Sequence, residues 1–85
     1  MDVSPEAIWS HLREVLGSSG SASIDGANDR DDFVEDLNID SLDLIELSVR
    51  LEQHFALTIP DKDLRKLRSV EQTVAYLRTR LGGHT

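Results

Sequence analysis

Apolar positions recur at the spacing of an amphipathic helix in three separate segments of this 85-residue chain. No segment shows the apolar–polar alternation of a half-buried strand. Ser4 and Pro5 are typical of a helix start, and a capping-box sequence that begins at Ser69 precedes the last segment. The pattern therefore predicts three long helices, at about residues 5–16, 41–55 and 70–81.

The segments between these helices depart from the pattern. Gly17 is a typical helix end, and residues 17–40 form a long predicted loop whose first half is rich in Gly, Ser, Asn and Asp. Pro60 interrupts the helical pattern, and a short helix is predicted at about residues 61–66. The expected fold class is all-α, a four-helix bundle with three longer helices and one short helix, in a single domain over residues 1–85.

The helix predicted at residues 41–55 has two apolar faces. At about 100° per residue, one face carries Leu44, Leu47, Leu51 and Phe55. A second face, about 130° away, carries Leu42, Ile45 and Val49, flanked by Glu46, Glu52 and Gln53. A small domain rarely buries two faces of one helix, so we expect the second face to be an exposed interaction surface. The alternative is that the long loop folds back and covers it.

A serine hydroxyl stands at the predicted start of this helix, where Asp40 precedes Ser41. The first-turn amides of a helix lack intrahelical partners and the helix dipole favours negative charge, so a phosphate on Ser41 would be well placed. The ordinary alternative is that Ser41 or Asp40 serves only as the N-cap. The short Asp-Ser-Leu sequence does not decide between these roles.

The longer run FVEDLNIDSLDLIEL at residues 33–47 resembles the signature of the acyl carrier protein family. The likeness continues through Ile59-Pro60-Asp61 to the last helix and covers about residues 5–81. It implies a carrier of acyl-carrier fold, not an enzyme. In this family a phosphopantetheinyl transferase moves 4′-phosphopantetheine from coenzyme A onto the serine that matches Ser41, and the thiol of this arm holds an acyl group as a thioester.

The resemblance also implies a surface that docks onto basic patches of partner enzymes. Asp40 and Leu42 flank the attachment serine, and the implied partner-binding residues are Asp40, Leu42, Asp43, Ile45, Glu46, Val49 and Glu52. The positions that line the family's interior, where an acyl chain can be sheltered, match Phe33, Leu47, Leu51, Phe55 and Ile59. The implied partners are the transferase, an acyl- or aminoacyl-activating enzyme, and downstream synthases or transferases.

The sequence leaves the cargo open, because fatty acyl groups, polyketide intermediates and amino acids all use the same serine and arm. Arg50, Gln53 and His54 stand where fatty-acid carriers are usually more acidic, which favours a specialised pathway over bulk fatty-acid synthesis. Asn38 stands where family members commonly have Gly, and Asn tolerates the positive φ of such a turn. An aminoacyl or peptidyl carrier and an unmodified helical interaction domain are the alternatives.

Charge and composition further limit the classes of molecule that this chain is expected to bind. Sixteen acidic and nine basic residues give a net charge of −7, which argues against binding to nucleic acid or an anionic membrane. Nine of the acids lie within residues 25–46, whereas Arg65, Lys66 and Arg68 belong to a basic stretch expected to be solvated or to pair with them. The chain has no Cys, no membrane-length apolar run and no signal peptide. We expect a free-standing, monomeric, cytoplasmic protein.

Catalytic and metal-binding functions lack the residues that they need. A hydrolase built on Ser41 requires a histidine base, but His54 lies 13 residues further along the same predicted helix, about 20 Å at 1.5 Å per residue. The acidic stretch at residues 25–32 lacks the spacing of a calcium-binding loop. We therefore predict no catalytic residue and no metal site.

Overall fold

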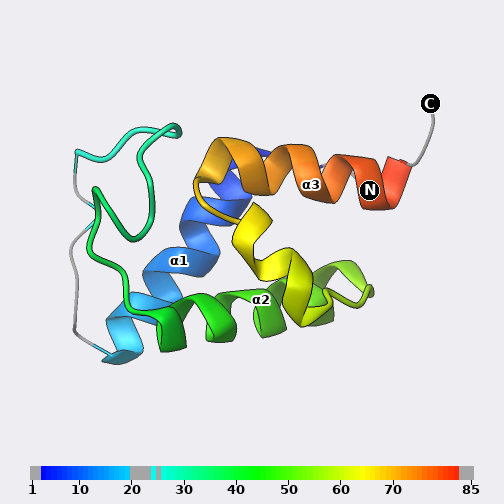
Figure 1. The fold of residues 1–85 in the computed structure, drawn as a ribbon, viewed down its shortest axis with the longest axis horizontal. Helices are drawn as coiled ribbons and strands as arrows, with labels where there is room; N and C mark the ends of the chain where they lie inside the picture. Colours follow the sequence, from blue (N-terminus) through cyan, green and yellow to red (C-terminus); the bar gives the residue numbers. More distant parts are fainter. Residues whose placement is uncertain (1–2, 20–23, 25, 83–85) are drawn as a thin grey trace.

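The computed structural model describes residues 3–19, 24 and 26–82, and every regular element in those ranges is a helix. The elements are α1 (Pro5–Ser19), α2 (Ser41–Phe55), the 3-10 helix η1 (Asp61–Lys66) and α3 (Val70–Gly82) (Figure 1). Helix α1 packs against both α2 and α3, and η1 contacts the same two helices. This arrangement confirms the predicted all-α class with three longer helices, one short helix and a long loop after α1.

Helix α1 begins where the sequence predicts and ends later. The hydroxyl of Ser4 caps it, because the Ala7 N–H donates to Ser4 Oγ at 3.3 Å. The prediction that Gly17 ends the helix is wrong, since α1 continues to Ser19. Glycine ends a helix when it takes a left-handed conformation, and Gly17 has no positive φ. Its only cost within the helix is the loss of backbone entropy.

One core lies between the helices and takes side chains from the loop as well. The side chains with no exposed surface include Ile8 and Leu12 of α1, Leu47 and Leu51 of α2, and Leu77 of α3. Phe33, from the loop before α2, is also fully buried among them. Burial of a side chain of this size stabilises the fold by about 1.5–3 kcal/mol. The loop is therefore part of the core rather than an appendage to it.

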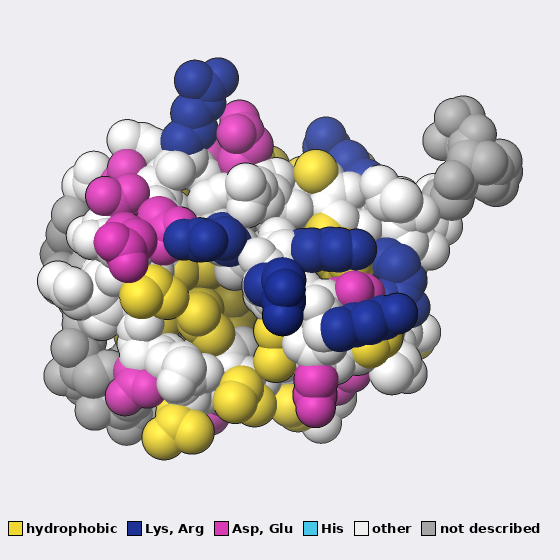
Figure 2. Space-filling view, in the orientation of Figure 1, with side chains coloured by type: hydrophobic (Ala, Val, Ile, Leu, Met, Phe, Trp, Pro, Cys, Tyr) yellow, Lys and Arg dark blue, Asp and Glu magenta, His cyan; other side chains and the backbone are white. Residues whose placement is uncertain are grey.

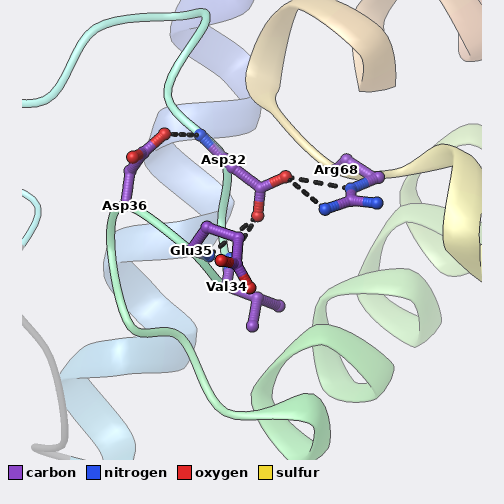
Figure 3. Close-up of polar contacts among 5 residues, drawn as sticks. All are labelled: Asp32, Val34, Glu35, Asp36 and Arg68. Atoms are coloured by element: carbon purple, nitrogen blue, oxygen red, sulfur yellow. Dashed lines mark hydrogen bonds and ion pairs between the residues drawn. The ribbon is translucent and has the colours of Figure 1, made fainter.

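Asp32 holds this loop in place through both of its carboxylate oxygens (Figure 3). Its Oδ1 accepts the N–H groups of Val34 and Glu35, both at 2.9 Å, and its Oδ2 lies 2.7 Å from a guanidinium nitrogen of Arg68. The Asp32 N–H in turn donates to Asp36 Oδ2 at 2.7 Å. These reciprocal bonds close a single turn of the loop. The ion pair with Arg68 joins this turn to the segment between η1 and α3.

Two turns require left-handed backbone at residues other than glycine. Asn38 has φ 56°, which confirms the expectation that Asn serves at this turn. Ala56 has φ 55° at the C-cap of α2, where its N–H donates to the carbonyl of Glu52. Nothing in the local sequence indicated the second turn, because Ala is not a typical left-handed residue.

Two histidines meet where α1 packs on α2. The ring centroids of His11 and His54 lie 4.8 Å apart, and Arg50 beside them pairs with Glu14 of α1. The Nδ1 atom of His11 is buried and has no hydrogen-bond partner within the described part of the chain. Burial, followed by the nearby charges of His54 and Arg50, lowers the pKa of His11 below its usual value of 6.5.

This lowered pKa predicts that stability depends on His11 below neutral pH. The unfolded chain takes up a proton near pH 6.5, whereas folded His11 stays neutral until a lower pH, so stability falls as the pH drops below 6.5. The slope from one such group is at most about 1.4 kcal/mol per pH unit. Urea unfolding of wild type and His11→Gln between pH 7.5 and 5.5 measures it. Equal slopes in the two proteins would contradict the assignment.

The lowered pKa of Asp32 predicts that the stability of the fold also depends on pH in the acidic range. Hydrogen bonds from the Glu35 N–H and from Arg68 lower the pKa of the Asp32 carboxyl, so its contribution is complete above its usual pKa and is lost as the pH falls through the lower folded value. Asp32→Ala should lower the free energy of unfolding by about 1–2 kcal/mol at pH 7. As the pH falls, the variant should then lose less stability than wild type does. Urea midpoints provide the measurement. The exposed neighbour Glu35→Ala serves as control and should leave the midpoint nearly unchanged.

Candidate functional site

Asp40 caps α2 and leaves Ser41 at the first helical position. Asp40 has extended backbone (φ −66°, ψ 148°), and its Oδ1 accepts the Leu42 N–H at 3.0 Å. Its carbonyl accepts the Leu44 N–H at 3.1 Å, the first bond of the helix. The sequence allowed either residue as the cap, and the structure assigns that role to Asp40. The Ser41 hydroxyl is therefore not used for capping.

The Ser41 side chain is exposed at the N-terminus of the helix. Its hydroxyl lies 3.5 Å from Asp40 Oδ1, a long hydrogen bond that exceeds the 2.6–3.2 Å expected of a base in place to remove its proton. The helix dipole favours a negative charge at this position. An exposed hydroxyl at a helix N-terminus therefore suits the attachment of a phosphodiester, whose oxygens would remain in reach of solvent and of a partner.

An apolar strip runs along α2 from this serine. Leu42 is 71% exposed, Ile45 46% and Val49 43%, as their spacing predicted. The long loop does not bury them, which answers the alternative that the sequence left open. We call these three residues the α2 strip. Val34 in the loop is also exposed, at 47%. The sequence pattern did not reveal the exposure of Val34, because a residue in irregular structure has no helical period to indicate its face.

The acidic residues predicted beside this strip differ in their placement. Asp40 and Glu46 are exposed, whereas Asp43 is only 7% exposed and does not lie on the surface with them. Asp43 and the buried Leu47 are four residues apart, so they lie on the same face of α2 and turn towards the interior. Glu52 is half-buried and accepts the Ile59 N–H at 2.7 Å, so it connects α2 to the segment after it.

Behind the strip, the residues that match the family's interior positions all lie in the core. Leu47, Leu51 and Phe55 face inwards from α2, opposite to the α2 strip. Phe33 and Ile59 reach the same core from the flanking loops. Helix α2 therefore separates an apolar interior from an apolar exposed strip, with the Ser41 hydroxyl at its N-terminal end.

Comparisons with known proteins identify the family of this chain. A family model described as the phosphopantetheine attachment site matches residues 6–77. An acyl carrier protein of Chlamydia caviae is 46% identical over 75 residues, which cover 88% of this chain and 92% of that protein. The chain belongs to the acyl carrier protein family.

Other relatives of this carrier include an acyl carrier protein of Lactobacillus acidophilus, 29% identical over 80 residues that cover 94% of the chain and all of the relative. A meromycolate extension acyl carrier protein of Mycobacterium tuberculosis is 35% identical over 77 residues, 91% of this chain and 67% of that protein. A solved structure of a candidate acyl carrier protein from Mycobacterium tuberculosis superposes with a TM-score of 0.72 at 25% identity, over 89% of this chain and 96% of that one.

Membership settles what kind of protein this is. Proteins of this family are carriers rather than catalysts, and they work with synthase and transferase enzymes. The prosthetic group of this carrier is covalently attached 4′-phosphopantetheine. Within the described ranges, no helix is both long and apolar enough to cross a membrane. The same ranges hold no group of three or more His, Cys, Asp or Glu side chains arranged to bind a metal ion.

The exposure of the α2 strip predicts that a charge can be placed on it without loss of the fold. Ile45→Asp should preserve the helical circular dichroism, because the side chain already contacts solvent. The same change should weaken modification by a phosphopantetheinyl transferase about tenfold, as expected for a central apolar contact of an interface. Leu47→Asp, on the buried face, is the matched control and should unfold the protein. Loss of helicity in Ile45→Asp would contradict the assignment.

Proposed function

We propose that this carrier holds its phosphopantetheine arm on Ser41 and presents acyl groups to partner enzymes through the α2 strip. The observation that carries the proposal is the exposed Ser41 hydroxyl, set at the first position of α2 by the Asp40 cap and continuous with the α2 strip. Ser48, by contrast, is buried on the same helix and donates to the Ile45 carbonyl at 2.6 Å.

The proposed attachment is a phosphoryl transfer from coenzyme A. The Ser41 oxygen forms a bond to the phosphorus of the pantetheine arm as the pyrophosphate bond of coenzyme A breaks. The adenosine bisphosphate half of coenzyme A leaves, and the hydroxyl proton passes to a base. We expect the transferase to supply this base, since the Asp40 carboxylate lies 3.5 Å from the hydroxyl, beyond the range of about 2.6–3.2 Å typical of a base in place. When attached, the arm supplies the thiol to which an acyl group is esterified, since the chain itself has no Cys.

Partner docking combines the α2 strip with the acidic side chains around it. Asp40 and Glu46 are exposed beside the strip and suit a basic patch on a transferase or synthase. Glu52 contributes only in part, because one of its oxygens is bonded to the Ile59 backbone. Asp43 is left out of this proposed surface, since it is buried.

We propose acyl rather than aminoacyl cargo, because the relatives described above are acyl carriers. The argument for a specialised pathway loses much of its force in the structure. Arg50 pairs with Glu14 and His54 packs against His11, so both side chains are engaged with α1. Gln53, the third of these non-acidic residues, is exposed. Among the described residues it has no ion pair or ring contact with α1 of the kind that Arg50 and His54 make.

Intact mass measurement tests the attachment site. Incubation with coenzyme A and a broad-specificity phosphopantetheinyl transferase should add one phosphopantetheine to wild type and none to Ser41→Ala. Ser10→Ala, which removes an exposed hydroxyl from α1, should be modified like wild type. A folded wild-type protein that gains no mass with several transferases would favour an unmodified interaction domain. Modification of Ser41→Ala would place the arm on another residue.

A further inference from the structure

A groove of about 640 Å³ lies between η1 and α3, apart from the α2 strip and Ser41. Its lining residues include four cations, Arg65, Lys66, Arg68 and Arg80, and a single acid, Asp63. Figure 2 shows Lys and Arg side chains gathered over this part of the surface, with the acidic side chains of the loop to one side. The lining is therefore net positive, whereas the chain as a whole has a net charge of −7.

Contacts within the groove hold several of its charged groups in position. The Tyr76 hydroxyl donates to Asp63 Oδ2 at 2.6 Å, and Lys66 Nζ lies 3.5 Å from the other Asp63 oxygen. Arg80 donates to the Tyr76 oxygen at 2.7 Å and lies 5.6 Å from the centre of its ring. The one acid in the groove is therefore already satisfied, and the guanidinium of Arg80 is set beside an aromatic surface.

The remaining cations keep capacity for an external anion. Arg65 is exposed and has no ion pair among the described residues. Arg68 bonds to Asp32 and still has guanidinium N–H groups beyond the two used there. Arginine forks that are held in place are suited to carboxylates, because two parallel N–H groups match the two oxygens.

We propose that the η1–α3 groove binds a carboxylate-rich, extended segment of a partner protein. Gln72 and Arg80 mark a length of about 12 Å along α3, at 1.5 Å per residue. In an extended chain, alternate side chains on one face are about 7 Å apart, so acids at three alternate positions span about 13 Å. The groove thus matches several carboxylates in a row, whereas one phosphate group would engage only part of it.

The charge of the whole chain argues against other anions. A net charge of −7 repels a nucleic acid, whose affinity comes mainly from many phosphate contacts over a wide surface. An acidic segment tethered to a partner that already docks on the α2 strip would overcome this repulsion through its high local concentration. The groove and the α2 strip share no residue, so one partner could contact both.

Fluorescence anisotropy of a labelled peptide tests the proposal. The probe is a capped Glu-Ser-Glu-Ser-Glu peptide, measured against the full chain at about 0.15 M salt, where charges act over about 8 Å and repulsion by the distant acidic residues is screened. Wild type should bind it and Arg65→Gln and Arg80→Gln should each bind about threefold more weakly, as is typical of exposed ion pairs. Arg13→Gln, which removes an exposed charge from α1, is the matched control and should bind like wild type. A Gln-Ser-Gln-Ser-Gln peptide should not bind.

Each contrary result overturns the proposal. No binding to wild type, or equal binding by all three variants, removes the groove as the site. Competition by inorganic phosphate at the same concentration as the peptide would show a simple anion site, and tighter binding of a single-stranded oligonucleotide would show a nucleic-acid surface. A concentration-dependent increase in mass without peptide that is lost in Arg65→Gln and Arg80→Gln would show that a second copy of the chain occupies the groove. Normal modification of Arg65→Gln and Arg80→Gln at Ser41 keeps these outcomes separate from the proposed carrier function.

Discussion

The position of Ser41, the proposed attachment serine, depends on how the loop before α2 is bound to the rest of the fold. The Phe33 N–H donates to the Arg68 carbonyl at 2.7 Å while the Phe33 ring is fully buried. The Ile39 N–H then donates to the Phe33 carbonyl at 2.8 Å, and the Asp40 cap follows directly. The loop is thus attached at both backbone and side chain. Helix α2 therefore starts at a defined place over the core.

Helix α2 has both a buried apolar face and an exposed apolar face because the domain is small. Its inner face supplies Leu47, Leu51 and Phe55 to the core, and no other helix among the described residues covers its outer face. Exposed apolar surface is an aggregation hazard in a protein that lacks a partner for it. The exposed acids Asp40 and Glu46 beside the strip limit that hazard and also suit it to basic partners.

The charges of the chain are separated in space as well as in sequence. Acidic groups surround the start of α2 and the loop, whereas η1 and α3 carry the basic groove (Figure 2). Two ion pairs, Arg68 with Asp32 and Arg30 with Glu71, connect these regions and are themselves partly exposed. Such pairs stabilise a fold only modestly, by about 0–1 kcal/mol each.

Local patterns in the sequence determined the helices, the caps at Ser4 and Ser69, the turn at Asn38 and the two faces of α2. Each depends on side-chain period or on backbone preference within a few residues, which the sequence displays directly. Contacts between distant residues decided the rest. Asp40 rather than Ser41 became the cap, Asp43 turned inwards, and Arg50 and His54 came to contact Glu14 and His11 of α1. Two adjacent residues with equal capping preference, or a charge whose partner lies 36 residues away, have no local signal to distinguish them, so only tertiary packing selects the outcome.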